Sequence, residues 1–522
     1  MKSKAASTTD RGEVDFDEKL KKATGKVIEA GFQMEAETFI FLQSQRGKVD
    51  PEIIVEFAIK KISEMAQPPP FVGKDLLEEA VAQLASSKET EQEPSGVEVA
   101  KVSFEPYARN IEPQLEVVRD AAAENSASGN VESFLSYFVD RFQQLRKILR
   151  QRLDVKDATT VGGALSESRG KKVKFVGMIS GKVERRGRFI LTVDDLERTT
   201  TVLVQPSNPR LFEKAQTLLL DQVICILGVR GANDLIIAED IVLPDIPYHT
   251  AKRSEEPINV VLTSDLHVGS KKFEEKLFER FVLWLNGKLG GERAREQAGR
   301  VKYIVIAGDL VDGIGVYPDQ EKELEVKDIY KQYDLVAGLL EQIPDYMQLI
   351  LIPGNHDASR KALPQPPIPS KYAEPIYRLE NVTSLGNPSQ VKLHGVEILI
   401  HHGRSLENIF ATIPGVNHQK PAKAMTYLLK ARHLAPVYGQ RTPLVPTPRD
   451  KLVIDSVPDI YHTGHIHISN HAAYRGTMVI NSGCWQGQTS YQRKMGLEPT
   501  PGIVPVVDLQ KMSLTLENFT AV

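Results

Sequence analysis

Five short polar motifs, spread in order along the second half of the chain, constrain this sequence more than any other feature. They are Asp265-Leu-His267, Gly308-Asp309, Gly354-Asn355-His356-Asp357, His401-His402-Gly403 and Gly464-His465-Ile466-His467. Each motif is expected where a strand ends in a loop, and consecutive motifs are separated by about one strand-helix-strand unit or slightly more. The spacing therefore predicts one group of polar side chains for each successive strand.

The apolar runs in this half of the chain are typical of buried strands. The clearest cover residues 258–263, 303–307, 349–352, 396–400 and 478–480. Helical segments alternate with them, so we expect an α/β domain over residues 255–522. In open α/β sheets the ligand site lies at the carboxyl ends of the strands, where loops distant in sequence converge. We therefore expect the five motifs to meet at one edge of the fold.

The side chains of the motifs together form a donor set suited to metal ions. Two carboxylates, one Asn oxygen and several imidazoles suit Mn²⁺, Fe²⁺ or Zn²⁺, and suit Mg²⁺ less because that ion prefers oxygen ligands and retained water. Two ions use so many donors more economically than one, and a carboxylate such as Asp309 could bridge them. Five such motifs in order argue against scattered histidines that merely fill a core.

Net charge and cysteine content exclude several other functions. The 65 Lys and Arg against 68 Asp and Glu leave a net charge of −3, so no global basic field indicates nucleic acid or an anionic membrane, and any DNA contact must be local. Cys225 and Cys484 cannot build a disulfide framework or a Cys-rich zinc site, which fits a reducing compartment. The longest apolar runs are only strand-length. We expect a soluble, cytoplasmic protein without a membrane partner.

The chain before the α/β domain divides into three parts. Residues 1–66 predict a small helical module, in which Asp50-Pro51 opens a helix. Residues 67–130, rich in Ser, Glu, Pro and Gln, predict a flexible polar linker. Residues 131–254 predict an amphipathic helix, capped by Asn130, and an OB-type β-barrel.

The predicted barrel consists of five short strands, with one helix over residues 209–218. Such barrels often bind single strands of nucleic acid by stacking bases on aromatic side chains. This one offers few aromatic residues, Phe175 and Phe189. A structural or protein-contact role is therefore at least as strongly favoured.

The ordered motifs resemble those of the calcineurin-like binuclear metallophosphoesterase superfamily, whose pattern is D-x-H, G-D, G-N-H-D/E, H-G and G-H-x-H. The resemblance implies a two-sheet sandwich flanked by helices that holds two divalent ions, with Mn²⁺ the leading choice and Fe²⁺ or Zn²⁺ the alternatives. It implies Asp265, His267 and His467 as ligands of one ion, Asn355, His402 and His465 as ligands of the other, and Asp309 as the bridge. It further implies that His356 is a catalytic imidazole that binds no metal, and its neighbour Asp357 is expected to orient it.

The His401-His402 doublet leaves one assignment open. The H-G motif selects His402, whereas His401 would point to the opposite side of the strand. Whether His401 also contributes stays open at this point. Five further histidines match no ligand position: His394, His418, His433, His462 and His471.

The surroundings of the motifs are similar to those of the small subunits of archaeal family-D DNA polymerases. This similarity rests on residues 313–323, 353–366, 402–405, 432–436 and 458–464, and it covers about residues 258–522. The order of helical module, linker and barrel repeats that of the family. A phosphoprotein phosphatase is disfavoured, because Gly313 and Asp357 stand where that branch has Arg and Glu.

This resemblance implies a metal-dependent 3′→5′ exonuclease that acts on DNA 3′ ends and proofreads for a separate large catalytic subunit. Two metal ions would clamp the phosphodiester, and His356, as an imidazolium, would stabilise charge or protonate the leaving oxygen. Arg360, Arg404 and Arg441 are candidate phosphate contacts, with ordinary surface arginines an equal alternative.

Two other functions stay open from the sequence. A non-catalytic scaffold that only docks the large subunit is one, and the intact ligand set argues against it. The other is an independent repair nuclease or cyclic-nucleotide phosphodiesterase, which the barrel and the helical module disfavour.

Overall fold

The chain folds into two compact units, Met1–Val102 and Ser103–Val522. The computed structural model describes residues 19–27, 30, 33–34, 36–45, 50–63, 71–74, 76–78, 80–81, 104–120 and 129–520. No helix within these ranges combines the length and the apolar composition that a membrane crossing requires.

The described residues of the first unit form short helices and one pair of strands. Its elements include β1 (Gln33–Met34), α2 (Ala36–Ser44), α3 (Pro51–Ser63) and β2 (Phe71–Val72), and residues 19–27 are also helical. Helix α3 begins where the sequence predicts. Asp50 Oδ1 accepts a hydrogen bond from the Glu52 N–H at 3.0 Å, and Pro51 stands at the first helical position, where no amide is needed.

Two six-stranded sheets form the α/β part of the second unit. The first has the order β12-β11-β10-β9-β18-β19, and the second has the order β16-β17-β15-β14-β13-β3. The strands of the first sheet are β9 (Asn259–Thr263), β10 (Val301–Ile306), β11 (Gln348–Leu351), β12 (Val382–Ser384), β18 (Ile503–Asp508) and β19 (Ser513–Asn518). Those of the second are β3 (Leu115–Asp120), β13 (Ser389–Leu393), β14 (Val396–Ile400), β15 (Ile460–Thr463), β16 (Asn470–Tyr474) and β17 (Thr477–Asn481). Neighbouring strands are parallel from β9 to β12 and through β14, β15 and β17, and the other pairs are antiparallel.

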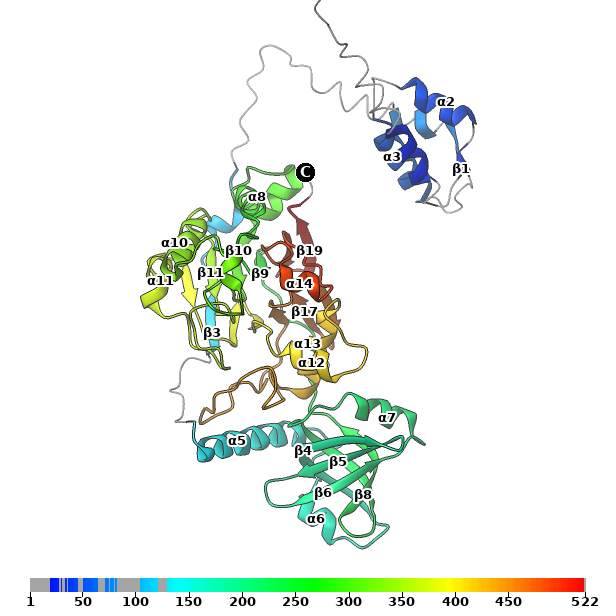
Figure 1. Cartoon of the computed structure of the whole chain (residues 1–522), viewed down its shortest axis with the longest axis vertical. Coiled ribbons are helices and arrows are strands. Elements are labelled where there is room, and N and C mark those ends of the chain that lie inside the picture. Colours follow the sequence, from blue (N-terminus) through cyan, green and yellow to red (C-terminus); the bar gives the residue numbers. More distant parts are fainter. Residues whose placement is uncertain are drawn as a thin grey trace, which may run out of the picture. The chain divides into compact units, whose positions relative to one another are not determined.

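The two sheets pack face to face, and helices cover their outer faces (Figure 1). Successive residues of a strand point to opposite faces. Val260 of β9 therefore shares the core between the sheets with Ile398 of β14, whereas Val261 packs with the outer helices. The first sheet is covered by α8 (Glu275–Leu285), α9 (Glu292–Gly299), α10 (Ile329–Leu340) and α11 (Ser370–Tyr377), and the second by α12 (Leu406–Thr412) and α13 (Pro421–Ala431).

A closed five-stranded barrel, in the order β4-β5-β6-β8-β7, precedes the α/β part. Its elements are α6 (Val161–Ser166), β4 (Lys172–Arg185), β5 (Arg188–Asp194), β6 (Thr199–Val204), α7 (Pro209–Gln216), β7 (Val223–Arg230) and β8 (Leu235–Val242). The five predicted strands and the predicted helix all occur at their expected positions. Both Phe175 and Phe189 are buried in the barrel core, so neither can serve as a stacking surface.

Helix α5 (Val131–Arg150) packs against both the barrel and the α/β part. It begins as predicted, because Asn130 Oδ1 accepts a hydrogen bond from the Ser133 N–H at 2.9 Å. Its fully buried Arg141 forms an ion pair of 2.7 Å with Asp450 in the α/β part. The boundary predicted between residues 254 and 255 therefore separates two parts of one compact unit.

The prediction of a flexible linker over residues 67–130 is wrong for two described segments. Strand β2 pairs with β1, and β3 pairs with β13 as an edge strand of the second sheet. The sequence pattern does not indicate β3, because two of its three apolar side chains are exposed: Val117 and Val118 are 42% and 41% exposed, and only Leu115 packs against the core between the sheets. Backbone hydrogen bonds to β13 hold the strand in place. It therefore lacks the alternation of apolar and polar residues from which a strand is predicted. The remainder of the predicted linker lies outside the described residues, apart from short stretches.

Candidate metal centre

The parallel strands of both sheets end at one edge, and every predicted motif follows one of these ends. Backbone hydrogen bonds join the loops there. The Asp265 N–H donates to the Gly308 carbonyl at 2.9 Å, and the Gly464 N–H donates to the His402 carbonyl at 2.9 Å. The predicted convergence of the motifs is confirmed.

Three overlapping groups of potential metal ligands lie at this edge, and within each group the ligand atoms are within 4.8 Å of one another. The groups are Asp265, His267 and His467; His267, Asp309 and His356; and Asp309, His402 and His465. Asn355 adjoins the third group, because its Oδ1 lies 3.0 Å from His402 Nε2. The structure thus brings together all seven side chains expected to bind metal, with His356 beside them.

The first group contains a buried carboxylate oxygen without a hydrogen-bond donor. Asp265 Oδ1 has no hydrogen-bond partner within the described part of the chain. It lies 3.4 Å from His467 Nε2 and 3.8 Å from His267 Nε2, and these two nitrogens are 3.1 Å apart. A buried, unsatisfied oxygen facing two imidazole nitrogens fits a bound cation, which would satisfy all three atoms.

The carboxylate of Asp309 lies between the groups. Its Oδ2 is 3.2 Å from His402 Nε2 and 3.7 Å from His267 Nε2, and its Oδ1 accepts the backbone N–H of His356 at 2.7 Å. One oxygen therefore faces ligands of both groups. This is the place that a bridging ligand would need.

Five of these residues have a left-handed backbone conformation. Asp265, His267, Asp309, His465 and His467 have φ angles between 52° and 70°. Residues other than glycine adopt this conformation rarely, at a cost of about 1 kcal/mol each, and such strain concentrates at functional sites. The strained backbone of these loops therefore sets the direction of these side chains.

Two glycines in the motifs allow the carboxylates to approach the backbone. A Cβ on Gly354 would lie 2.1 Å from Asp309 Oδ1, and a Cβ on Gly464 would lie 2.5 Å from Asp265 Oδ2. Both contacts are far shorter than van der Waals distance. A larger residue at either position would displace a carboxylate.

Attraction between opposite charges sets the protonation of the cluster. Burial disfavours charge, yet the imidazoles of His467 and His267 hold the pKa of Asp265 well below its usual range, and His402, with His267, does the same for Asp309. Against burial, the carboxylates in turn raise the pKa of His267 to about 10 and that of His402 to about 9. Cys484 and Asp265 raise the pKa of His467 to about 9. Without metal, the cluster keeps its positive charge as protons on imidazoles.

His356 is oriented by a backbone carbonyl. Its Nδ1 lies 2.7 Å from the Asp312 carbonyl oxygen, so the Nδ1–H donates there. Burial lowers the pKa of His356 to about 4. The ring is therefore neutral at pH 7 in the free protein.

Asp357 does not orient His356, contrary to the expectation from their adjacency. Its carboxylate instead accepts the backbone N–H groups of Asp309 at 2.9 Å and Gly354 at 2.8 Å, and the Tyr333 hydroxyl at 3.2 Å. Burial, followed by the charge of Asp309, raises the pKa of Asp357 to about 6. Asp357 thus fixes the loop that carries the Asp309 carboxylate.

Sequence reasoning missed two other residues of the centre. Asp312 Oδ1 lies 3.0 Å from His267 Nδ1, and Gln492 Nε2 lies 2.9 Å from His467 Nδ1. Each side chain contacts the ring nitrogen that faces away from the other imidazole, and so fixes the orientation of the ring. Asp312 stands three residues after Asp309, a spacing that could have drawn attention to it. Gln492 belongs to the short helix α14 (Ser490–Lys494), far from any motif, and no sequence signal indicates it.

The structure separates His401 from the cluster. Its Nδ1 lies 3.0 Å from Asn387 Oδ1 and its Nε2 3.1 Å from Ser405 Oγ, so both ring nitrogens are engaged elsewhere. Of the histidines that match no ligand position, His433 contacts Asp450 and His462 contacts Ser482. Among the described residues, the groups of potential metal ligands do not include His394, His401, His418, His433, His462 or His471.

The three candidate phosphate-binding arginines have different surroundings. The Arg360 guanidinium donates to the carbonyls of Ala362 and Pro364, and the exposed Arg441 lies 3.3 Å from Glu407. Arg404 donates to the Lys361 carbonyl at 3.3 Å. Burial lowers the pKa of Arg404, while the charge of Asp309 opposes this change. Arg404 is therefore the arginine with an electrostatic link to the centre.

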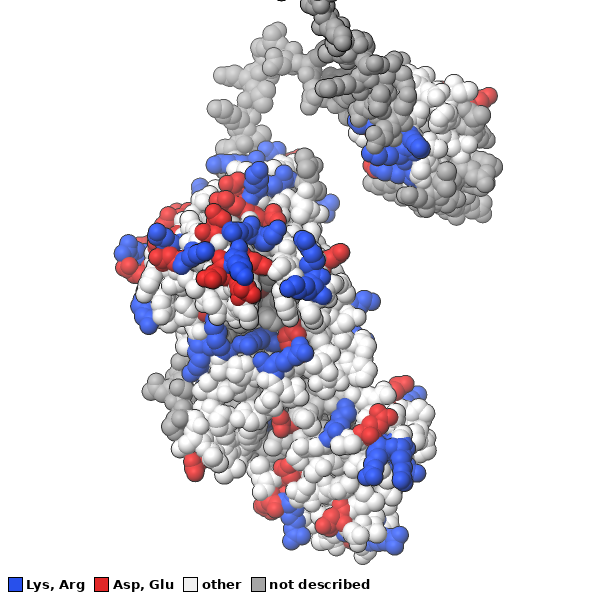
Figure 2. Space-filling model, viewed as in Figure 1, with Lys and Arg blue, Asp and Glu red and all other residues white. Residues whose placement is uncertain are grey.

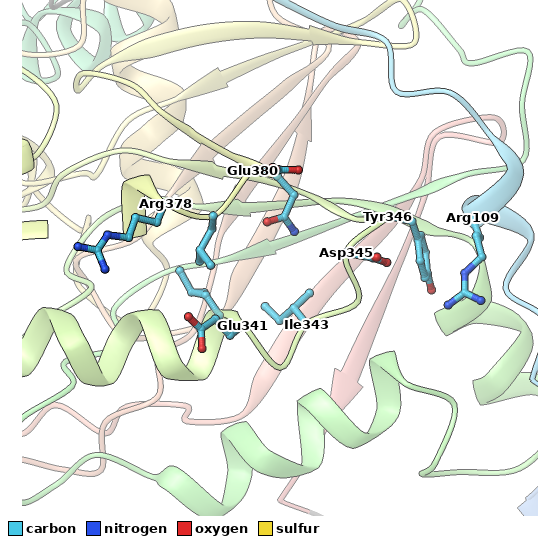
Figure 3. Close-up of a pocket in the computed structure, with 10 residues that line it drawn as sticks. Arg109, Glu341, Ile343, Asp345, Tyr346, Arg378 and Glu380 are labelled. Carbon is cyan, nitrogen blue, oxygen red and sulfur yellow. The ribbon is translucent and has the colours of Figure 1, made fainter. Parts of the chain in front are cut away.

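A separate cavity of about 780 Å³ lies away from these groups (Figure 3). It is lined by Arg109, Leu340, Glu341, Ile343, Asp345, Tyr346, Arg378, Leu379, Glu380 and Asn381. Residues 345–346 precede β11, so the cavity lies toward the amino end of that strand, whereas the motifs follow its carboxyl end. No predicted site residue lines it.

Comparison with known proteins gives the family. The family model for the B subunit of DNA polymerases alpha and epsilon matches residues 260–470, a span that contains all five motifs. The DNA polymerase II small subunit of Archaeoglobus fulgidus is 40% identical over 454 residues, which are 86% of this chain and 89% of that protein. This chain belongs to the family of DNA polymerase II small subunits. The resemblance drawn from the sequence to the archaeal family-D small subunits is confirmed.

The length of the match varies among members of this family. The DNA polymerase II small subunit of Pyrococcus furiosus is also 40% identical, over 381 residues, which are 73% of this chain and 62% of that protein. The matched segment therefore spans less than two thirds of the Pyrococcus furiosus relative.

We predict that Gly354→Ala weakens metal binding by roughly 10-fold or more, because the added methyl group collides with the Asp309 carboxylate. Mn²⁺ affinity measured by calorimetry checks this. Gly338→Ala in α10 is the matched control: nothing lies within 4 Å of its Cβ, so metal affinity should not change and stability should rise by about 0.5–1 kcal/mol. Unchanged affinity in Gly354→Ala would contradict the role given to this close approach.

We also predict that Mn²⁺ affinity rises with pH up to about pH 9, and less steeply from there to about pH 10. His267, His402 and His467 must lose protons to bind metal, and their raised pKa values of about 10, 9 and 9 keep those protons on in the metal-free protein. Calorimetry in buffers with different ionisation heats counts the protons released. His402→Gln should release about one proton fewer than the wild type, and the exposed control His471→Gln should release the same number. Binding without proton release would contradict the assigned ligands.

Proposed function

We propose that this chain is a metal-dependent 3′→5′ exonuclease that hydrolyses the terminal phosphodiester of DNA for a DNA polymerase. The observation that supports this most strongly is the convergence of the motifs into adjoining ligand groups that share Asp309. We further propose that this domain is a calcineurin-like phosphoesterase. Its two face-to-face sheets with ligands at one strand edge agree with that assignment.

The donor set fits two divalent ions, with Mn²⁺ preferred. Asp265, His267 and His467 would hold one ion, Asn355, His402 and His465 would hold the other, and Asp309 would contact both. Bound there, the ions would polarise the phosphodiester and lower the pKa of an attacking water. The protein contributes fixed positions: Asp312 and Gln492 hold two imidazoles, and Asp357 holds the loop of Asp309.

His356 would act on the substrate through Nε2. Because its ring is neutral in the free protein, it would become an imidazolium only when the negative charge of a bound phosphodiester raises its pKa. The proton could then pass to the leaving 3′ oxygen. Arg404 would add positive charge beside the bound phosphate.

Any contact with DNA must involve a limited patch of the surface and not the protein as a whole. Figure 2 shows acidic and basic side chains intermixed over much of the visible face, with one row of Lys and Arg across the α/β part. The net charge of −3 provides no general attraction to phosphates. Efficient binding of duplex DNA would therefore depend on another component.

We predict that Asp309→Ala lowers both Mn²⁺ occupancy and hydrolysis of single-stranded DNA, the latter by a factor on the order of 10³, because a shared ligand is lost. His356→Ala should retain both ions and lose activity by a factor on the order of 10². Metal analysis and release of mononucleotides measure these effects, and His471→Ala is the control.

Two outcomes would reject parts of this proposal. Loss of metal in His356→Ala would show that His356 is a ligand. If the wild type, loaded with Mn²⁺, released no mononucleotides, the alternative of a non-catalytic scaffold would be favoured.

We propose that the partner is the large catalytic subunit of the same polymerase, since the relatives carry the name small subunit. Adding that subunit should raise exonuclease activity on a primer-template and change activity on short single strands less, because the partner would deliver duplex ends. Titration of the large subunit against both substrates is the measurement. Equal activity with and without the subunit on primer-template DNA would favour an independent nuclease.

A further inference from the structure

Two segments outside the five motifs flank the candidate metal centre. One is the loop of residues 313–325, which includes Tyr317 and a 3-10 turn η4 (Gln320–Lys322), and the other is α14. The Tyr317 ring lies edge-on to His356, with 6.2 Å between ring centroids. Helix α14 contacts the centre through the bond between Gln492 and His467. Both segments therefore adjoin the atoms that would act on a substrate.

Glu323 joins these two segments. Its carboxylate accepts a hydrogen bond from Ser490 Oγ at the start of α14, and it lies 3.3 Å from the Tyr317 hydroxyl. The backbone around it is fixed as well, because the Lys271 N–H donates to the Glu323 carbonyl at 2.9 Å. Helix α14 is held by a complete capping box between Thr489 and Gln492. The two segments thus form one anchored wall beside the centre.

This wall presents aromatic and basic side chains to solvent. Tyr491 is 62% exposed and Met495 is 54% exposed, and Arg493 and Lys494 between them are exposed too. Tyr317 is half-buried. An exposed aromatic ring next to two cations, beside a centre suited to phosphodiesters, has the composition of a surface that binds single-stranded nucleic acid.

We propose that Tyr491 and Tyr317 stack on unpaired bases at the 3′ end of a DNA strand, while Arg493 and Lys494 contact its phosphates. This inference rests on the proposed exonuclease function and adds the side chains that would hold the terminal nucleotides. A base can stack on a tyrosine only after it leaves its partner strand, so these contacts require unpaired terminal bases.

The test compares the full-length Tyr491→Ala variant with the full-length wild type, both loaded with Mn²⁺, on three substrates. These are a single-stranded oligonucleotide, the same oligonucleotide with an abasic 3′-terminal nucleotide, and bis(p-nitrophenyl) phosphate. Loss of stacking should raise KM for the normal oligonucleotide by roughly 10-fold. The variant and the wild type should be alike on the abasic oligonucleotide, because it offers no terminal nucleobase. The kcat for bis(p-nitrophenyl) phosphate should also be unchanged, because loss of stacking affects binding and not the metal centre. Tyr491→Trp should restore binding.

The matched control is Tyr248→Ala, which removes a ring that is 81% exposed. The neighbouring His249 N–H donates to the Arg475 carbonyl in the turn between β16 and β17, at the end of β17 opposite the metal centre. This variant should behave as the wild type on all three substrates. An unchanged KM in Tyr491→Ala, or an equal rise for normal and abasic ends, would overturn the proposal.

Failure of the proposed function is recognised separately. If the wild type hydrolyses none of the substrates, the exonuclease proposal fails, and fluorescence anisotropy with a labelled single strand still tests the wall. A loss of affinity of roughly 10-fold in Tyr491→Ala would support the stacking role, and equal affinity of variant and wild type would overturn it.

Discussion

Two carboxylates buried at the ends of neighbouring strands require positive charge close by. The side chains of Asp265 and Asp309 are almost entirely inaccessible to solvent, and a buried charge is strongly unfavourable unless an opposite charge compensates it. In the metal-free chain the compensation comes from protons on His267, His402 and His467. Divalent ions would supply the same charge more compactly and would also satisfy the unpaired Asp265 Oδ1.

The rest of the centre holds these charges in place. Left-handed backbone at five residues, close contacts at Gly354 and Gly464, and the hydrogen bonds from two loops to Asp357 all restrict where the carboxylates can lie. The left-handed backbone and the close contacts at glycine are each energetically unfavourable by themselves. The packed sheets on which the loops stand make them tolerable, because the strand ends are fixed in register.

The sequence predicted those features that depend on pattern and spacing. Runs of buried apolar residues indicated β9, β10, β11 and β14, and the motifs after the strands indicated the groups around Asp265 and Asp309. It did not indicate β3, whose Val117 and Val118 face solvent, because an edge strand held by its backbone has no distinctive alternation.

Residue roles that depend on loop geometry also could not be predicted from the sequence. Adjacency in a motif suggested that Asp357 orients His356, but the loop turns its carboxylate toward backbone N–H groups and leaves His356 to the Asp312 carbonyl. Gln492 reaches His467 from a helix with no motif of its own. Such contacts are set by tertiary folding, and spacing along the chain carries no information about them.

We propose that one strand edge of the α/β part holds two ions that share Asp309. Electron paramagnetic resonance of the chain loaded with Mn²⁺ tests this claim most directly, because two ions about 3.5–4 Å apart interact magnetically. A filled site should give the spectrum of a coupled pair, and Asp309→Ala should lose this coupling. A spectrum of isolated ions at every Mn²⁺ loading of the wild type would contradict it.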